Sequence, residues 1–480
     1  MQKLRSRVAL TTFSLALLFF TLQYLSSQDQ DHRYSLLFSS QTVSDDVLEN
    51  ITTAAQTFVD QPVVAPFKNQ FWEVGRRSAQ VKKWFGLLKH EAHGSDKVHE
   101  VLSNVEEAAV SLFPFIPPSS DGLPLSSLFH LPEKGSKGIV MSVGGPNINI
   151  RFAGHLISAI RHVFGCKLPL EITYAGEEDL PIRYREALAS LDETGQISFV
   201  DMLKVFDDKT LRLKENGWAI KPFSVLASRF EQVLLVDCDS VFLQDPKSLF
   251  HQQPYVDNGA YLFHDRLLWQ HAFKGRHEWF HDQVKEPSPA LNRSLVWTEE
   301  YAEECDSGVV VLDKSRPDVF FGVLHTAWQN TYDVREEVTY KITYGDKESW
   351  WLGLELTGAA YEFEEHYGSM LGWESRQASE DGKETAEVCS FVIAHADTKG
   401  DLLWFNGSLL KNKLKEPDAY DVPDAWVMDG TWRKGATKQD MSCMVDAPSK
   451  RLSEEEHHIL QRSMGEAMAV DALMKSVVVT

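Results

Sequence analysis

Cysteine is scarce in this chain, with five residues in 480. A scaffold built on disulfides needs a much higher density, and no cysteine spacing here resembles a zinc site. Because the count is odd, at least one cysteine is unpaired or pairs outside the chain, and we expect Cys238 to remain a thiol. With 43% hydrophobic and 11% aromatic residues, the chain can instead bury one large core or two ordinary ones.

Positive charge is also in short supply. The 48 lysines and arginines stand against 69 aspartates and glutamates, which gives a formal net charge of −21. This balance argues against nucleic acid as a partner. An anionic substrate would need a metal ion or a local basic patch.

The glycine-rich motifs of nucleotide cofactor sites are missing. Gly144 and Gly145 follow the first predicted strand and could let the backbone approach a nucleotide, but residues 146–149 read Pro-Asn-Ile-Asn and do not continue as Gly-x-Gly-x-x-Gly. The chain also has no Gly-x-x-x-x-Gly-Lys-Ser/Thr motif. Dehydrogenase and phosphate-loop functions are therefore not indicated.

A targeting signal opens the sequence. Basic residues at positions 3, 5 and 7 precede a largely apolar run from Val8 to Leu25, after which residues 26–31 are polar. The run is long enough to span a bilayer, with its basic flank on the cytoplasmic side. A cleaved signal peptide is the alternative, but no small-x-small cleavage site follows. We therefore predict that residues 1–25 form a cytoplasmic tip and an uncleaved transmembrane signal anchor.

Residues 26–135 are predicted to form a stem. They are helix-prone and poorly patterned, with helices expected around Phe71 and from Val81 to Leu88, and proline-rich breaks at 114–118 and 124. Such a segment would space the rest of the chain from the membrane. A packed accessory subdomain is the competing interpretation, because the segment contains aromatic residues.

From Gly138 onward strands and helices alternate. Apolar runs predict strands at Ile139–Val143, Leu170–Tyr174, Ile197–Val200 and Val233–Val236. Helical spacing of apolar residues after the first strand, and again from Pro222 to Phe230, predicts helices between them. This alternation predicts an α/β fold with a mainly parallel sheet, whose ligands bind at the carboxyl ends of the strands.

Two aspartates stand at such an end. Asp237 and Asp239 directly follow the buried strand Val233–Val236. In an extended chain, residues two apart lie on the same side, so both carboxylates could bind one divalent cation, with Mg²⁺ or Mn²⁺ favoured over zinc. A solvated turn is the alternative for an isolated Asp-x-Asp. Three polar clusters downstream, at 259–266, 306–314 and 344–351, favour the site because they accompany the aspartates.

Over about 138–407 the chain resembles the fungal Golgi mannosyltransferases, the family of α-1,3- and α-1,2-mannosyltransferases. The order and spacing of several motifs carry the resemblance. These are Cys166-Lys167-Leu168-Pro169-Leu170-Glu171, Lys221-Pro222-Phe223-Ser224, Ser228-Arg229-Phe230-Glu231, Val236-Asp237-Cys238-Asp239 with Asp245-Pro246, Asp265-Arg266, Ser307-Gly308-Val309-Val310, Gly345-Asp346-Lys347-Glu348, and His395 with Trp404-Phe405-Asn406-Gly407.

The resemblance implies a nucleotide-sugar transferase fold of the GT-A type and a metal-dependent retaining transfer of mannose from GDP-mannose. A divalent ion at the leaving diphosphate would stabilise the transition state. The resemblance also implies a role for each site residue. These residues are Asp237, Asp239 and His395 as ligands of Mn²⁺ or Mg²⁺, Gly144, Gly145, Lys221 and Lys347 as donor-binding residues, and Asp306 and Asp346 as catalytic candidates that contact the sugar or steady its positive charge.

The resemblance also implies a location and partners. It predicts a single-pass type II protein of the Golgi membrane, held by its N-terminal helix, with a lumenal catalytic domain over 136–430 and a C-terminal extension with a helix over 431–480. The acceptor would be a mannosylated glycan or glycoprotein, and α-1,3 transfer is favoured over α-1,2 transfer. A glycosidase would need two carboxylates flanking the scissile bond, which one Asp-x-Asp does not supply. A catalytically silent carbohydrate-binding protein would not need the metal and lysine residues.

Overall fold

The central feature of the fold is a seven-stranded sheet in the order β3-β2-β1-β4-β7-β6-β8. The structure is a computed structural model that describes residues 43–480 except 91–95, 146, 379–383 and 480. The strands are β1 (Glu133–Ser142), β2 (Leu170–Tyr174), β3 (Ile197–Asp201), β4 (Phe230–Val236), β6 (Ala260–His264), β7 (Cys305–Asp313) and β8 (Glu362–Phe363).

Strand direction confirms the α/β fold with a mainly parallel sheet. Strands β1 to β4 pair in parallel, β7 runs antiparallel to both β4 and β6, and β8 is parallel to β6. Within this sheet β7 alone therefore runs against the other strands. The order reverses at β1, which lies between β2 and β4. In α/β sheets the crevice beside such a reversal is where ligands bind.

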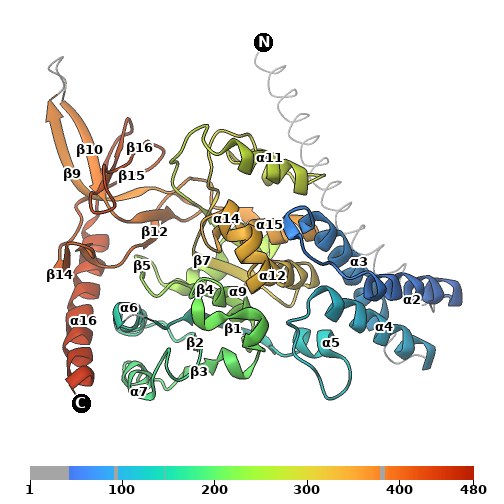
Figure 1. The fold of residues 1–480 in the computed structure, drawn as a ribbon. Coiled ribbons are helices and arrows are strands. Elements are labelled where there is room, and N and C mark those ends of the chain that lie inside the picture. The colour runs from blue at the N-terminus through green and yellow to red at the C-terminus, as the bar shows by residue number, and fades with distance from the viewer. Residues whose placement is uncertain (1–42, 91–95, 146, 379–383, 480) are drawn as a thin grey trace, which may run out of the picture.

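The strand β4 is buried on both faces, as its apolar run predicts. Val233 and Leu235 belong to one hydrophobic cluster, while Leu234 and Val236 belong to the other. Helices α9 (Ile220–Ala227), α12 (Pro317–Gln329) and α15 (Lys347–Thr357) supply the first cluster. Helices α6 (Asn147–Ser158), α7 (Ile182–Ala189) and α16 (Glu454–Val479) supply the second (Figure 1).

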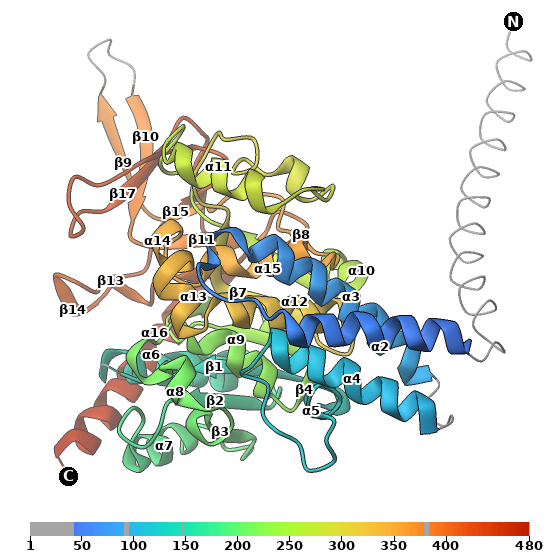
Figure 2. The same ribbon diagram turned by 45° about the vertical axis from the view of Figure 1, so that its right-hand side comes forward.

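The described part of the segment predicted as a stem, which starts at residue 43, is instead packed against the sheet domain. It forms α2 (Asp45–Asp60), α3 (Phe71–His90), α4 (Asp96–Leu112) and α5 (Pro124–Phe129), whose buried residues belong to the same hydrophobic cluster as α12 and α15. The ring of Phe71 is fully buried and lies 4.9 Å from the rings of both Trp279 and Trp328. Figure 2 shows α3 alongside α12 and α15. The spacer interpretation is corrected, and the packed subdomain is the one observed.

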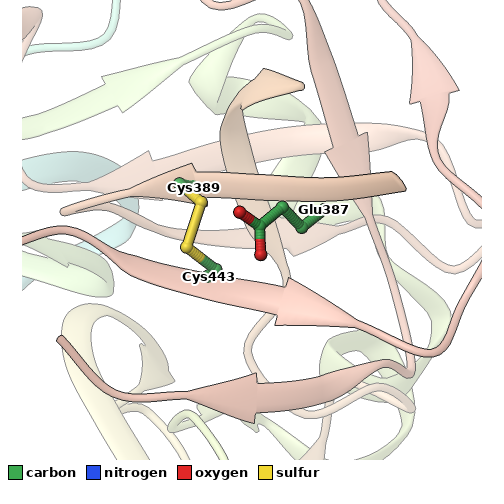
Figure 3. Close-up of side chains that lie close together, drawn as sticks. All are labelled: Glu387, Cys389 and Cys443. Carbon is green, nitrogen blue, oxygen red and sulfur yellow. A yellow bond between two sulfur atoms is a disulfide. The ribbon is translucent and has the colours of Figure 1, made fainter. Parts of the chain in front are cut away.

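A second β region follows the main sheet. Strands β5 (Ser240–Phe242), β12 (Leu402–Asn406) and β11 (Ile393–Ala396) form a three-stranded sheet, and a six-stranded sheet contains β9 (Met370–Ala378), β10 (Glu384–Ser390) and β17 (Ser442–Val445). A disulfide joins Cys389 of β10 to Cys443 of β17 (Figure 3). Cys238 is a free thiol, as expected.

The remaining elements connect or edge these layers. Their bounds are α8 (Asp208–Leu211), α10 (Gln253–Asn258), α11 (Lys274–Gln283), α13 (Tyr332–Val334), α14 (Tyr340–Ile342), β13 (Leu410–Asn412), β14 (Glu416–Tyr420), β15 (Ala425–Val427), β16 (Thr431–Arg433) and β18 (Lys450–Arg451).

The predicted membrane topology is corrected. Across residues 43–90, 96–145, 147–378 and 384–479, none of the helices combines the length and the apolar character that crossing a bilayer requires. This finding contradicts the prediction of a single-pass type II membrane protein. The apolar run from Val8 to Leu25, predicted as the anchor, lies outside the described residues.

The packing of α3 can be tested by truncating one ring. Phe71→Ala should lower the free energy of unfolding by about 3–5 kcal/mol, because a fully buried aromatic side chain leaves a cavity that its neighbours fill only in part. Thermal unfolding followed by circular dichroism measures the change. Trp72→Ala is the matched control. The adjacent Trp72 side chain is 39% exposed, so its truncation should lower the free energy of unfolding much less. Equal effects from the two variants would contradict the packing described.

Candidate active site

A cavity of about 770 Å³ opens at the carboxyl ends of β1 and β4. All of the predicted site residues except His395 line it. Its charged lining residues are Asp179, Glu215, Asp237, Asp239, Asp306 and Asp346 on the acidic side and Lys214, Lys221, Arg266, Lys347 and Lys413 on the basic side. The cavity therefore gathers five basic side chains alongside six carboxylates in a strongly acidic chain.

Lys221 is a buried cationic side chain that lines the cavity. It lies in the first turn of α9 and is 6% exposed. Its Nζ lies 2.7 Å from Asp237 Oδ1 and 3.5 Å from Asp346 Oδ2, and it donates to the Ser307 hydroxyl at 3.2 Å. Burial acts to lower the pKa of Lys221, but the neighbouring carboxylates outweigh it and raise the pKa above its usual value. Lys221 is thus a permanent positive charge.

Asp237 is placed by the end of β4. Its backbone N–H donates to the Gly308 carbonyl at 2.8 Å, which joins the chain after β4 to β7. Burial, together with repulsion from Asp239 and Asp346, raises the pKa of Asp237 from 3.8 to about 6, although Lys221 acts in the opposite direction. A further cation beside Asp237 would favour its ionised form.

Asp239 has a separate lysine partner. The chain turns between β4 and β5 instead of staying extended, yet both aspartates still line the cavity. Asp239 Oδ2 lies 2.7 Å from Nζ of Lys413, in the turn between β13 and β14. Sequence reasoning missed Lys413. No local signal marked it, because its contact with Asp239 joins residues 174 positions apart.

Asp306 is held by several donors at the start of β7. It is 1% exposed and accepts hydrogen bonds from the Gly308 N–H at 2.9 Å and from the Asn406 amide at 3.3 Å. His395 Nε2 lies 3.2 Å from its Oδ2. Burial acts to raise the pKa of Asp306, but His395 and Lys347 more than offset it and hold the pKa well below its usual range. Asp306 is therefore an ionised, immobilised carboxylate.

The structure does not bring His395 to the two aspartates. Its ring is fully buried, stacks 4.3 Å from Trp404 and pairs with Asp306. Among the described residues, the group of three possible ligands whose ligand atoms all lie within 4.8 Å of one another is Glu387, Cys389 and Cys443 (Figure 3). Its two cysteines form the disulfide, so this is not a metal site. In this structure His395 contacts Asp306, and its role as a third metal ligand stays a prediction.

Lys347 is the first residue of α15, and Asp346 precedes it. Lys347 Nζ contacts Asp265 Oδ2 at 2.5 Å, and carboxylates including Asp306 raise the pKa of Lys347 against the effect of its burial. Asp346 accepts from Trp350 Nε1 at 2.9 Å. Asp265, which is fully buried, belongs to the polar cluster 259–266, but the sequence did not predict it as the partner of Lys347.

Gly144 and Gly145 line the cavity at the end of β1. The Gly145 N–H donates to Asp179 Oδ1 at 2.7 Å, and a Cβ added at Gly144 would lie 2.1 Å from Asp179 Oδ2. Gly145 has φ +74°, which also favours glycine. Close packing on Asp179 therefore requires Gly144, and donor contact by these glycines stays a prediction.

Residues 136–397 match the family model described as "Mannosyltransferase putative". The match covers more than half of the chain. The chain belongs to this mannosyltransferase family. The resemblance to fungal mannosyltransferases is thereby confirmed.

The curated relatives of this family member come from yeasts. The chain is 27% identical to the Saccharomyces cerevisiae alpha-1,3-mannosyltransferase MNT3 over 282 residues, which cover 52% of this chain and 43% of that protein. It is 25% identical to alpha-1,3-mannosyltransferase MNN1 of the same species over 347 residues, covering 62% of this chain and 43% of that one. The chain thus spans about half the length of the curated relatives it matches.

Solved structures give only weak similarity. The S. cerevisiae mannosyltransferase Ktr4p aligns with a TM-score of 0.31 at 10% identity, covering 64% of this chain and 81% of that one. The galactosyltransferase LgtC aligns with a TM-score of 0.31 at 14% identity, covering 45% and 70%. Similarity at this level carries no inference about the fold or the site.

The charge state of Asp237 predicts a pH effect on stability. Because its pKa is raised from 3.8 to about 6, the folded chain holds a proton more tightly than the unfolded chain between these values. This carboxyl therefore destabilises the fold progressively as pH rises from about 4 to about 6. Asp237→Asn lacks the effect, so its stability relative to the wild type should rise over that window, by up to about 3 kcal/mol.

Thermal unfolding in EDTA across this pH range measures the difference. Asp239→Asn removes one of the carboxylates that raise the pKa of Asp237, so it should reduce the pH dependence in part. A stability difference between Asp237→Asn and the wild type that is constant with pH would contradict the burial and charge environment described for Asp237.

Proposed function

We propose that this chain is a mannosyltransferase that moves mannose from GDP-mannose to a mannose-containing glycan, forming an α-1,3 linkage with retention at the anomeric carbon. The observation that carries the proposal is the cavity at the carboxyl ends of β1 and β4, where carboxylates and lysines of a mannosyltransferase family member meet. The relatives named alpha-1,3-mannosyltransferases support the linkage.

The basic residues of the cavity suit an anionic donor. Lys347, Arg266 and Lys413 line it from three different segments, although the chain as a whole carries a charge of −21. Lysine and arginine side chains aimed at a diphosphate stabilise the negative charge that develops as it leaves. We propose that these residues and Lys221 contact the diphosphate of the donor, together with a cation that offsets the carboxylates of the site.

The donor set of Asp237 and Asp239 fits a divalent cation such as Mn²⁺ or Mg²⁺. Carboxylate oxygens are the ligands these ions prefer. Burial and neighbouring carboxylates raise the pKa of Asp237, and a cation bound beside it would favour its ionised form. When bound there, the cation would supply charge stabilisation for the diphosphate. Lys221 contacts Asp237 through Oδ1, and Lys413 contacts Asp239 through Oδ2.

We propose that Asp306 and Asp346 contact the transferred mannose. Both line the cavity, and each is nearly fully buried and held by fixed donors. An ionised carboxylate held in place can accept hydrogen bonds from sugar hydroxyls and stabilise an oxocarbenium-like charge. His395 is a positioning residue in this account, because it contacts Asp306 and not the cavity.

The metal role of Asp239 gives a direct test. Asp239→Asn keeps the shape of the side chain but removes a full negative charge. Mannosyl transfer from GDP-mannose should fall by at least about two orders of magnitude, comparable with losing one strong electrostatic contact in the transition state. Transfer is measured across a Mn²⁺ titration, with EDTA as the metal-free reference and thermal unfolding as the check on folding.

Ser240→Ala is the matched control. Ser240 follows Asp239 directly, is buried, and donates to the Gly308 carbonyl at 3.2 Å without lining the large cavity. Its loss should leave the Mn²⁺ dependence unchanged. Near-normal transfer by Asp239→Asn at low Mn²⁺ would overturn the metal assignment, and no transfer by the wild type would overturn the proposed function.

A further inference from the structure

Two exposed aromatic side chains line the active cavity. Trp218 is 45% exposed and Tyr344 is 59% exposed, although most tryptophans of the described chain are buried. Their ring centroids lie 5.3 Å apart with an interplanar angle of 51°. Exposed aromatic surface is unfavourable in water, so a pair gathered at a cavity indicates a binding surface. The proposed mechanism uses neither ring.

The ring of Trp218 is held in place before any ligand arrives. Tyr340 packs against it edge-on, with centroids 6.3 Å apart. Gly345 lies under the ring, since a Cβ added there would come within 3.0 Å of it. A side chain held in this way gives up little conformational freedom on binding, and such preorganisation strengthens binding.

The aromatic pair comes from the same two segments as the buried ion pair of the site. Trp218 precedes Lys221 by three residues, and Tyr344 precedes Asp346 by two. Lys221 and Asp346 are 6% and 2% exposed and lie 3.5 Å apart. In each segment the aromatic side chain is therefore much more exposed than the neighbouring member of the ion pair. The rings stand at the open side of the reaction centre.

We propose that Trp218 and Tyr344 form the acceptor subsite, where a hexopyranose ring of the incoming glycan stacks by its C–H face on the aromatic rings. This inference rests on the proposed function, because the acceptor is the second substrate of that reaction. A pyranose ring offers an apolar face of C–H groups beneath its hydroxyls. Aromatic rings with a polar edge, such as Trp and Tyr, suit such a partly apolar, partly hydrated ligand.

We place the nucleotide at the strand ends that line the cavity. In sheets of this kind it binds beside the strand reversal, which here is the crevice between the ends of β1 and β4. Gly144 and Gly145 line that crevice after β1, and Asp237 lines it after β4. Tyr344 instead follows α14, well after β7 in the chain. In this proposal the donor takes the strand ends and the acceptor takes the exposed aromatic pair of the same cavity.

Kinetics with two substrates test the proposal. Trp218→Leu and Tyr344→Leu should raise KM for an α-linked mannobiose acceptor about tenfold or more, as truncation of an aromatic anchor does, and raise KM for GDP-mannose much less. Titration calorimetry with the same mannobiose, without donor, should show the same loss of affinity. Trp269→Leu is the control, because Trp269 is 43% exposed but does not line the cavity, and its values should match the wild type.

The outcomes separate the subsite from the proposed function. An equal or larger rise in KM for GDP-mannose would assign the rings to the nucleotide and overturn the proposal. Unchanged mannobiose binding in both variants, or no mannobiose binding by the wild type, would also overturn it. Mannobiose binding that depends on Trp218, in a wild type that neither transfers nor hydrolyses GDP-mannose, would keep the subsite and refute the proposed function.

Discussion

The site depends on one buried ammonium group, that of Lys221. It contacts Asp237 after β4, Asp346 before α15 and Ser307 in β7, so a single side chain of α9 joins three other segments. An almost fully buried charge is tolerated only when it is paired, and removing one partner leaves the rest uncompensated. The positions of the carboxylates are therefore fixed by an internal charge balance before any substrate binds.

A second charged cluster connects the site to the C-terminal helix. Asp471 of α16 accepts from Arg151 Nε at 2.6 Å and from the Tyr420 hydroxyl at 2.7 Å. Tyr420 ends β14, the second strand of the hairpin whose turn carries Lys413 to Asp239. The C-terminal helix is thus linked through the β13–β14 hairpin to the second aspartate of the site. Local basic charge is brought into the cavity by elements that are far apart in the sequence.

The sequence predicts well the parts of the fold that local pattern determines. Strand β2 has the predicted bounds Leu170–Tyr174, and the run at 233–236 lies in β4, because strands buried on both faces need continuous apolar residues. Such local patterns do not predict contacts between distant segments. The packing of Phe71 on Trp279 and the pairing of His395 with Asp306 depend on residues far apart in the chain, so spacing arguments miss them. Lys413 escaped for the same reason.

The central claim is that the strand-end cavity binds a nucleotide-sugar donor through a cation held by Asp237 and Asp239. Titration calorimetry of GDP-mannose into the full chain, with Mn²⁺ present and again after EDTA, measures this directly. The account predicts binding with Mn²⁺ and an affinity at least about tenfold weaker in EDTA, a difference of about 1.4 kcal/mol. Equal affinity under both conditions would contradict the claim.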